Sequence, residues 1–179
     1  MRKVLYILGQ LDDRDVEWMA HVGLRHVFAD GEVLIAEGRP TPDLFIVLDG
    51  EVVVEVAGVG VVARLGSGEV LGEMSFVDKA PPSATVRSAG PAEVLAIDKR
   101  RIEDRLGENA AFAGRFYKAL AIFLADRLRA TTRRKPGGGK IDTSAIEADE
   151  LDESVLDGVS MAGVRFRQML ATLRGGGGA

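Results

Sequence analysis

Hydrophobic positions between Val27 and Ile97 fall into short runs that are separated by turn residues. The segments GEVLIAEG, LFIVLDGEVVVEV, GVVARLG and AEVLAI are rich in β-branched residues and partly alternate between apolar and polar positions. Runs of about four to eight residues with this pattern predict β-strands. No helical segment separates these runs, which favours an antiparallel roll or sandwich over parallel β–α–β units.

Two glycine-containing turns are expected inside this block. Asp49-Gly50 lies between LFIVL and EVVVEV, and this dipeptide favours a two-residue hairpin because glycine accepts a positive φ without steric cost. Gly58-Val59-Gly60 predicts a second hairpin turn between EVVVEV and GVVARLG.

Helical patterns flank the strands. The segment DDRDVEWMAHVG predicts a helix that begins at capping aspartates and ends at Gly23. A short helix is expected over Lys99–Leu106 and a long one over residues 109–135. The long helix carries two neighbouring apolar stripes, Phe112, Phe116, Leu120 and Phe123 in one and Tyr117, Ala121, Leu124 and Leu128 in the other. A stripe wider than one face indicates two contact surfaces, of which the second is either the protein's own chain or a partner's copy of this helix.

The C-terminal part of the chain differs from the roll in composition and in hydrophobic pattern. Pro136–Gly139 ends the long helix, and the acidic stretch that follows predicts a flexible linker over residues 136–158. Helical periodicity returns over residues 159–174, where Val159, Ala162, Phe166, Met169 and Leu173 share a face, and residues 175–179 are expected to be disordered. We therefore expect a mainly β protein with flanking helices. Its parts are an antiparallel, jelly-roll-like β-roll over about 27–97 within a domain of residues 1–134, a long C-terminal helix and an amphipathic tail helix.

Composition narrows the class of protein. The chain is 46% apolar, has a net charge of -4 and contains no cysteine, which excludes disulfides and thiolate metal sites. No apolar run approaches the roughly 20 residues needed to cross a membrane, and the N-terminus lacks the pattern of a signal peptide. These features predict a cytoplasmic protein with no membrane partner.

Catalytic and DNA-binding patterns are missing from the sequence. The two histidines, His21 and His26, are too few for a metal-binding jelly roll or a hydrolase triad, and no Gly-x-Ser-x-Gly elbow occurs. The basic residues near the end of the long helix complement its dipole, and one helix beyond them cannot supply a helix-turn-helix. We therefore expect no enzyme, no cofactor, no metal and no direct binding of nucleic acid.

The segment GEMSFVDKAPPSATV, Gly72–Val86, carries the most specific pattern. Together with the glycines of GEVLIAEGRP, LFIVLDGEVVV and LGSGEVLGE, it resembles the phosphate-binding cassette of the cyclic nucleotide-binding domain family, over roughly residues 10–134. This family is found in bacterial catabolite-activator-type regulators, kinase regulatory subunits and gated channels. The resemblance implies a non-catalytic, bacterial-type regulatory protein that stands alone without a helix-turn-helix and whose ligand is cyclic AMP or cyclic GMP.

The resemblance also implies which residues contact the ligand. In the cassette these are Gly72, Glu73, Met74, Ser75, Pro82, Ser83, Ala84 and Thr85. Small residues let a phosphate approach the backbone N–H groups, and Glu73 would accept a hydrogen bond from the ribose 2′-hydroxyl. Thr131 and Thr132 match the hydroxyl residues that touch the purine in such regulators. The alternative is that these two threonines end the long helix on its solvent side.

One position departs from the family's pattern, because Pro82 stands where the family has an arginine. Proline has neither a charge nor an N–H group, and a lost charge-assisted hydrogen bond of about 1.5–3 kcal/mol would weaken binding about ten- to a hundredfold. Lys79, Arg64 and Arg87 are the candidate replacement cations.

Two hypotheses remain open. In the first, the roll senses a cyclic nucleotide or a related small anion, with weakened affinity. In the second, it has lost nucleotide binding and serves as a dimerisation or docking scaffold. We expect a homodimer through the 109–135 helix, and a tail helix that docks on its own roll, on a protein partner or on the vacant cassette.

Overall fold

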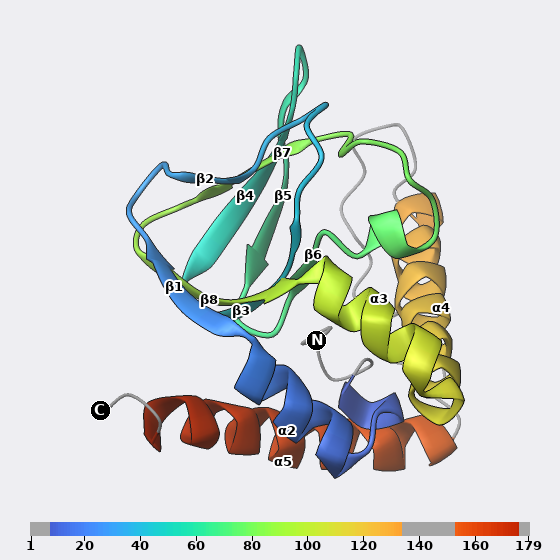
Figure 1. Cartoon of the computed structure of the whole chain (residues 1–179). Helices are drawn as coiled ribbons and strands as arrows, with labels where there is room; N and C mark the ends of the chain where they lie inside the picture. Colours follow the sequence, from blue (N-terminus) through green and yellow to red (C-terminus); the bar gives the residue numbers. More distant parts are fainter. Residues whose placement is uncertain (1–7, 134–152, 176–179) are drawn as a thin grey trace.

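The strands pair into two antiparallel sheets of four, in the orders β1-β8-β3-β6 and β2-β7-β4-β5. A computed structural model describes residues 8–133 and 153–175, and the sheets face each other while the helices gather on the outer side of the first one (Figure 1). The predicted fold class, an antiparallel β-roll with flanking helices, is confirmed. The strands are β1 Leu24–Phe28, β2 Val33–Ile35, β3 Asp43–Asp49, β4 Glu51–Val56, β5 Gly60–Gly66, β6 Val70–Leu71, β7 Thr85–Ser88 and β8 Ala92–Asp98.

The central strand β3 is buried on both faces, which explains its nearly continuous apolar run. Phe45 and Val47 point into the space between the two sheets, where they join Leu71 and Val94. Alternate residues such as Ile46 point to the other face and pack against the helices. Because side chains alternate along a strand, one apolar run contributes to two separate cores.

The turn at Asp49-Gly50 is not a hairpin, and this prediction is wrong. β3 pairs with β6 and β8, whereas β4 pairs with β5 and β7, so Gly50 lies at a corner where the chain passes between sheets. Its φ is 84°, and a Cβ atom there would lie 2.4 Å from the Pro91 carbonyl oxygen. Glycine is needed here for a close approach of two backbones as well as for its positive φ.

The second predicted turn is confirmed, because β4 and β5 pair antiparallel on either side of Gly58 and Gly60. Three strands, β1, β6 and β7, were not predicted from the sequence. β1 lies at the edge of its sheet with four of its five residues exposed, and β6 has two residues, so neither carries a readable alternation. The strands of the roll therefore begin at Leu24 and end at Asp98.

The first helix, α2 (Asp13–Val22), has the predicted ends. Asp12 caps it, and the side chains of Asp12 and Asp15 each accept a hydrogen bond from the other's backbone N–H. Gly23 follows its last residue, and its N–H donates to the Met19 carbonyl. This reciprocal capping satisfies N–H groups that a helix start leaves without intrahelical partners.

Two further helices follow the roll, α3 (Lys99–Glu108) and α4 (Ala110–Arg133). The first predicted stripe of α4 is buried, with Phe112 and Phe123 fully inaccessible. The second is not covered in the same way: Tyr117 is 47% exposed and Ala121 is exposed. Leu124 of the second stripe is partly buried against the same core, and the Leu128 side chain lies outside the described part of the structure. The protein's own chain therefore covers the first stripe and part of the second.

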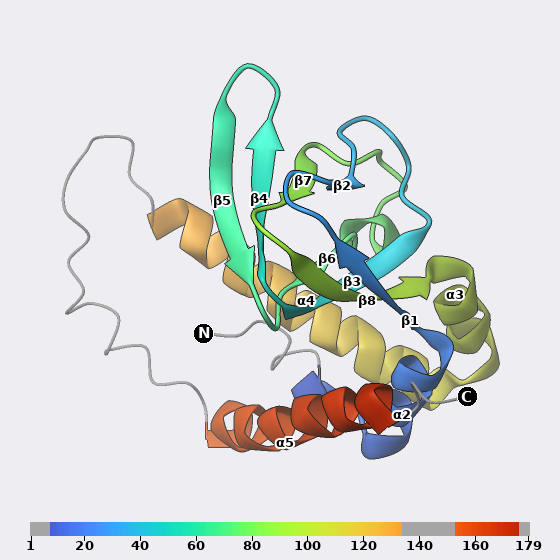
Figure 2. The same ribbon diagram turned by 90° about the vertical axis from the view of Figure 1, so that its left-hand side faces the viewer.

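The tail helix α5 (Glu153–Gly175) begins at Glu153 rather than at residue 159, so residues 153–158 of the predicted linker are helical. Residues 134–152 and 176–179, with most of the predicted linker and terminus, lie outside the described ranges. α5 runs beside α2 (Figure 2). Ala162, Phe166 and Met169 on its predicted apolar face are buried. The tail thus packs on the helical layer of its own chain.

None of the helices in the described residues is long and apolar enough to span a membrane.

Candidate functional site

The cassette begins with a tight turn directly after β6. Gly72 has a φ of 80°, and a Cβ atom there would lie 2.9 Å from the Asp43 carbonyl oxygen. A short 3₁₀ helix, η1 (Met74–Phe76), follows, and the Ser75 hydroxyl donates a hydrogen bond of 3.3 Å to the Gly72 carbonyl. Glycine at position 72 therefore allows both the positive φ of this turn and its close approach to the backbone of β3.

An aromatic contact joins this turn to the long helix. The rings of Phe76 in η1 and Phe116 in α4 pack edge to face, with centroids 5.3 Å apart. This geometry is favourable for aromatic pairs. Phe76 was not predicted as a functional residue. The signal that could have found it is one aromatic residue inside the cassette and an aromatic stripe on the predicted long helix.

Glu73 is buried at the interface between roll and helices. It is 2% exposed and lines a cavity of about 10 Å³ with Leu44 and Ile46 of β3 and Phe116 and Leu120 of α4. This volume is close to the smallest that holds one water molecule. The residue predicted to meet a ribose thus lines a small, mainly apolar hollow on the helix side of the first sheet.

A lysine lies under the same turn. Lys99, the first residue of α3, is 7% exposed, and its Nζ donates a hydrogen bond of 2.9 Å to the Thr41 carbonyl. Its Nζ would lie 3.4 Å from a Cβ atom at position 72. Burial lowers the pKa of Lys99, and the negative charge of Glu73 and Asp43 opposes this shift. Sequence reasoning missed this residue because it lies in a run of basic residues that resembles a solvated helix start.

The far end of the cassette bonds to the loop that follows β2. The Pro82 carbonyl accepts a hydrogen bond of 2.8 Å from the Gly38 N–H, and the Thr85 hydroxyl oxygen accepts one of 3.1 Å from the Glu37 N–H. The Glu37 carboxylate accepts a third, of 3.0 Å, from the Ala57 N–H in the β4–β5 turn. Glu37 therefore links the cassette end to the hairpin.

Two of the predicted site residues line hollows, and the two hollows share no lining residue. Thr85 lines an open groove of about 570 Å³ together with Glu37, Glu55 and the β4–β5 turn, whereas Glu73 lines the small closed cavity. Beside these, Ala84 is half-buried, and Met74 and Ser83 are exposed. Thr131 and Thr132 lie in the last turns of α4, and their side chains are outside the described part of the structure.

Two of the candidate cations are already paired. Arg64 contacts Glu51 at 2.6 Å. Arg87 contacts Glu55 at 3.2 Å and donates a hydrogen bond of 2.9 Å to the Gly31 carbonyl. Lys79 is exposed on the cassette itself. Both arginines therefore have acidic partners in this structure.

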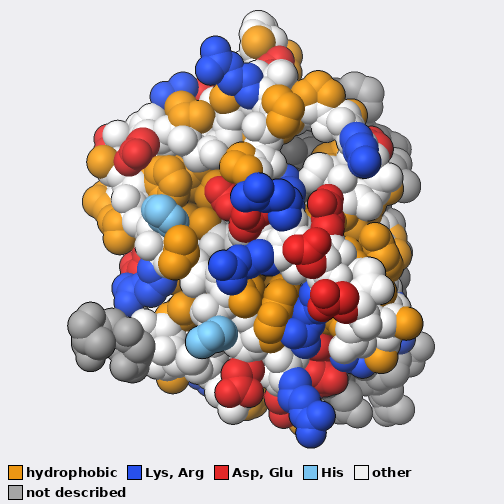
Figure 3. Space-filling view, in the orientation of Figure 1, with side chains coloured by type: hydrophobic (Ala, Val, Ile, Leu, Met, Phe, Trp, Pro, Cys, Tyr) orange, Lys and Arg blue, Asp and Glu red, His pale blue; other side chains and the backbone are white. Residues whose placement is uncertain are grey.

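Charges of both signs are interspersed over the face seen in Figure 1. Figure 3 shows Lys and Arg side chains next to Asp and Glu side chains across the helices and the adjoining roll. Such mixing differs from the basic patch that marks a nucleic-acid surface.

Solved structures of other proteins share this fold. A cyclic nucleotide-binding domain from Methylobacillus flagellatus matches with a TM-score of 0.66 at 22% sequence identity, over 78% of this chain and 85% of that one. The Thermus thermophilus catabolite activator protein matches with a TM-score of 0.59 at 21% identity, over 96% of this chain and 88% of that one. The N-terminal domain of a transcriptional regulator from Streptomyces coelicolor matches with a TM-score of 0.58 at 26% identity, over 75% of this chain and 99% of that one.

The sequence itself matches a family model. The model described as "Cyclic nucleotide-binding domain" covers residues 25–126, which is more than half of the 179 residues. This range contains all the strands from β2 to β8 and the whole cassette with its Gly72 turn. The chain therefore belongs to the cyclic nucleotide-binding domain family.

Proposed function

We propose that this protein is a non-catalytic regulatory protein that senses a cyclic nucleotide or a related small anion through an altered cassette. The observation that carries the proposal is the contact between the cassette and the long helix. η1 follows the Gly72 turn directly, and its Phe76 packs on Phe116 of α4. A ligand that displaces this turn would displace α4 as well.

The burial of Glu73 indicates how the site would respond to a ligand. At 2% exposure its carboxylate is not available to a ribose hydroxyl in the arrangement described here. Ligand binding would therefore require the cassette to shift away from α4. A ligand moves such an equilibrium by the difference between its affinities for the two arrangements.

The alternative is a scaffold that keeps the fold but has lost nucleotide binding. Pro82 and the paired state of Arg64 and Arg87 favour it. So does the groove at Thr85, because its lining includes Glu37, an acidic residue that disfavours a phosphate, and Glu55, which is already paired with Arg87.

We further propose that both versions act as a homodimer through the 109–135 helix, with Tyr117 and Ala121 of α4 at the contact. Their exposure on a helix whose other stripe is buried supports this assignment. A protein partner for the tail would bind the face of α5 that carries Met161 and Val164, which are 54% and 47% exposed.

The test is isothermal titration of the protein with cyclic AMP and cyclic GMP, with Pro82→Arg measured beside the wild type. Micromolar binding by the wild type would support the sensor. No binding by the wild type, with binding restored in Pro82→Arg, would support the scaffold with an intact but vacated pocket.

Ala80→Arg is the matched control, because it adds the same charge at an exposed position of the same cassette. An equal gain in Ala80→Arg and Pro82→Arg would show that bulk charge, rather than the geometry of position 82, produces the effect. No binding by any variant would contradict the sensing function.

A further inference from the structure

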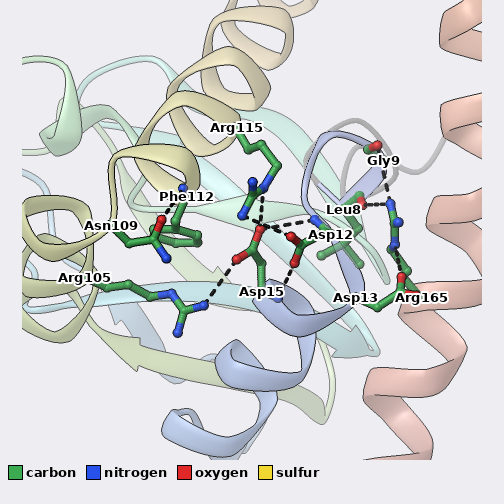
Figure 4. Close-up of polar contacts among 10 residues, drawn as sticks. All are labelled: Leu8, Gly9, Asp12, Asp13, Asp15, Arg105, Asn109, Phe112, Arg115 and Arg165. Carbon is green, nitrogen blue, oxygen red and sulfur yellow. Dashed lines mark hydrogen bonds and ion pairs between the residues drawn. The ribbon is translucent and has the colours of Figure 1, made fainter.

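Arginine side chains from three other helices contact aspartates at the start of α2 (Figure 4). Asp15, which is 1% exposed, accepts hydrogen bonds from Arg115 Nε of α4 at 2.7 Å and from Arg105 Nη2 of α3 at 3.2 Å. Arg115 also contacts Asp12 at 3.1 Å. The capping box of α2 is therefore also the point where the helices that follow the roll are attached.

The tail helix binds the other side of the same turn. Arg165 Nε of α5 donates to the Asp13 carboxylate at 2.6 Å, and its Nη1 donates to the Leu8 carbonyl at 3.0 Å. The Arg165 side chain is 13% exposed. Because a guanidinium presents several donors in a fixed plane, this one side chain fixes α5 to both α2 and the segment before it.

Cation–π and aromatic contacts continue from this turn to the cassette. The Arg105 guanidinium lies 4.3 Å from the centre of the Trp18 ring, and Trp18 packs edge to face on Phe112 at 5.7 Å. Phe112 in turn lies 5.7 Å from Phe116, the residue that contacts the cassette. Contacts thus run without a break from α5 through α2 to α4 and on to Phe76.

We propose that α5 is a regulatory helix that docks reversibly on α2 and, through the first turn of α2, restrains α4 and the cassette that rests on it. The helices attached to this turn differ in how they are held. α3 and α4 are joined to α2 by the buried Asp15, whereas α5 reaches it through Asp13, which is 71% exposed. Because its ion pair is open to solvent, α5 would leave before α3 and α4, and its departure would expose the apolar face that carries Ala162, Phe166 and Met169.

The experiment is amide hydrogen exchange of the full chain, comparing Arg165→Ala with the wild type. Loss of a charge-assisted contact is expected to accelerate exchange in α5 about tenfold or more. The restraint on α4 predicts a parallel acceleration in α2 and in residues 105–116. Acceleration confined to α5 would overturn the proposal, because α5 would then be a passive appendage.

Arg167→Ala is the matched control, since Arg167 is an exposed arginine on the same helix. Equal exchange in the two variants would also overturn the proposal. If Arg165→Ala does not fold, Arg165→Gln removes the charge but keeps part of the aliphatic stem and a polar end. The same comparison with the wild type and Arg167→Ala then tests the proposal.

The link from α5 to the ligand rests on the proposed sensing function. With cyclic AMP as the probe, Arg165→Ala is expected to lower the Kd about fivefold or more, and the ligand is expected to loosen α5 by the same factor, since coupling is reciprocal. An unchanged Kd would overturn that link. If the wild type binds neither cyclic AMP nor cyclic GMP, the sensing function fails, while the hydrogen-exchange comparison still decides whether α5 restrains α4.

Discussion

At the residue scale, the buried Lys99 lies next to the Gly72 turn and stabilises it. The lysine satisfies the Thr41 carbonyl and places a positive charge near the buried carboxylate of Glu73. Burying either charge alone would be costly, so each makes the other's burial more tolerable. The start of the cassette therefore depends on a side chain that follows it by more than 20 residues.

We expect Lys99→Met to lower the free energy of unfolding by about 1–3 kcal/mol, because the Thr41 carbonyl loses its donor in a buried site and Glu73 loses a nearby cation. Urea denaturation followed by circular dichroism measures the change. Arg101→Met is the control, because Arg101 is exposed on the same helix. A loss no larger than that of the control would contradict this role for Lys99.

At the element scale, Asp15 joins three helices through one carboxylate. Burial alone would raise the pKa of Asp15, but the hydrogen bond and charge of Arg115, the Asp12 backbone and Arg105 together hold it below the ordinary value of 3.8. A carboxyl whose pKa is lower in the folded state stabilises the fold at any pH above its unfolded value. This contribution is lost as the pH falls through the folded-state pKa.

We therefore expect Asp15→Asn to lower the free energy of unfolding by about 1.5–3 kcal/mol at neutral pH, since it removes charge-assisted hydrogen bonds. Below about pH 4 the wild type should lose stability more steeply than the variant, so that the two curves converge. Denaturant titrations at a series of pH values measure both curves. Asp104→Asn, at an exposed position of α3, should run parallel to the wild type. Parallel curves for Asp15→Asn would rule out this role for Asp15.

At the scale of the whole molecule, α4 carries two apolar stripes with different surroundings. One of its stripes contacts the cassette and α2, and the other leaves Tyr117 at the surface. A helix with one buried and one partly exposed apolar stripe can join two copies of a chain without disturbing its own core.

On the proposed dimer, Tyr117→Arg should convert a dimeric species to a monomer with an unchanged circular dichroism spectrum, because a charged side chain on each copy would be forced into the contact. Sedimentation velocity measures the change. Ala111→Arg places the same charge at an exposed position on another face of α4, and it should remain dimeric. A wild type that sediments as a monomer would exclude the proposed interface.

The sequence by itself determined the features that depend on neighbouring residues. The cap at Asp12, the end of α2 at Gly23 and the β4–β5 turn are local choices of backbone and hydrogen bond, and the structure has them where the pattern predicts them.

Tertiary structure alone decided which distant segments meet. Asp49-Gly50 is a good hairpin dipeptide, yet β3 and β4 belong to different sheets, because β3 pairs with β6 and β8, which lie more than 20 residues further along the chain. The burial of Glu73 beside Lys99 and the docking of α5 on α2 also depend on such contacts. Local patterns define the shape and apolar face of each element, whereas the partner of that face is chosen by packing over the whole chain.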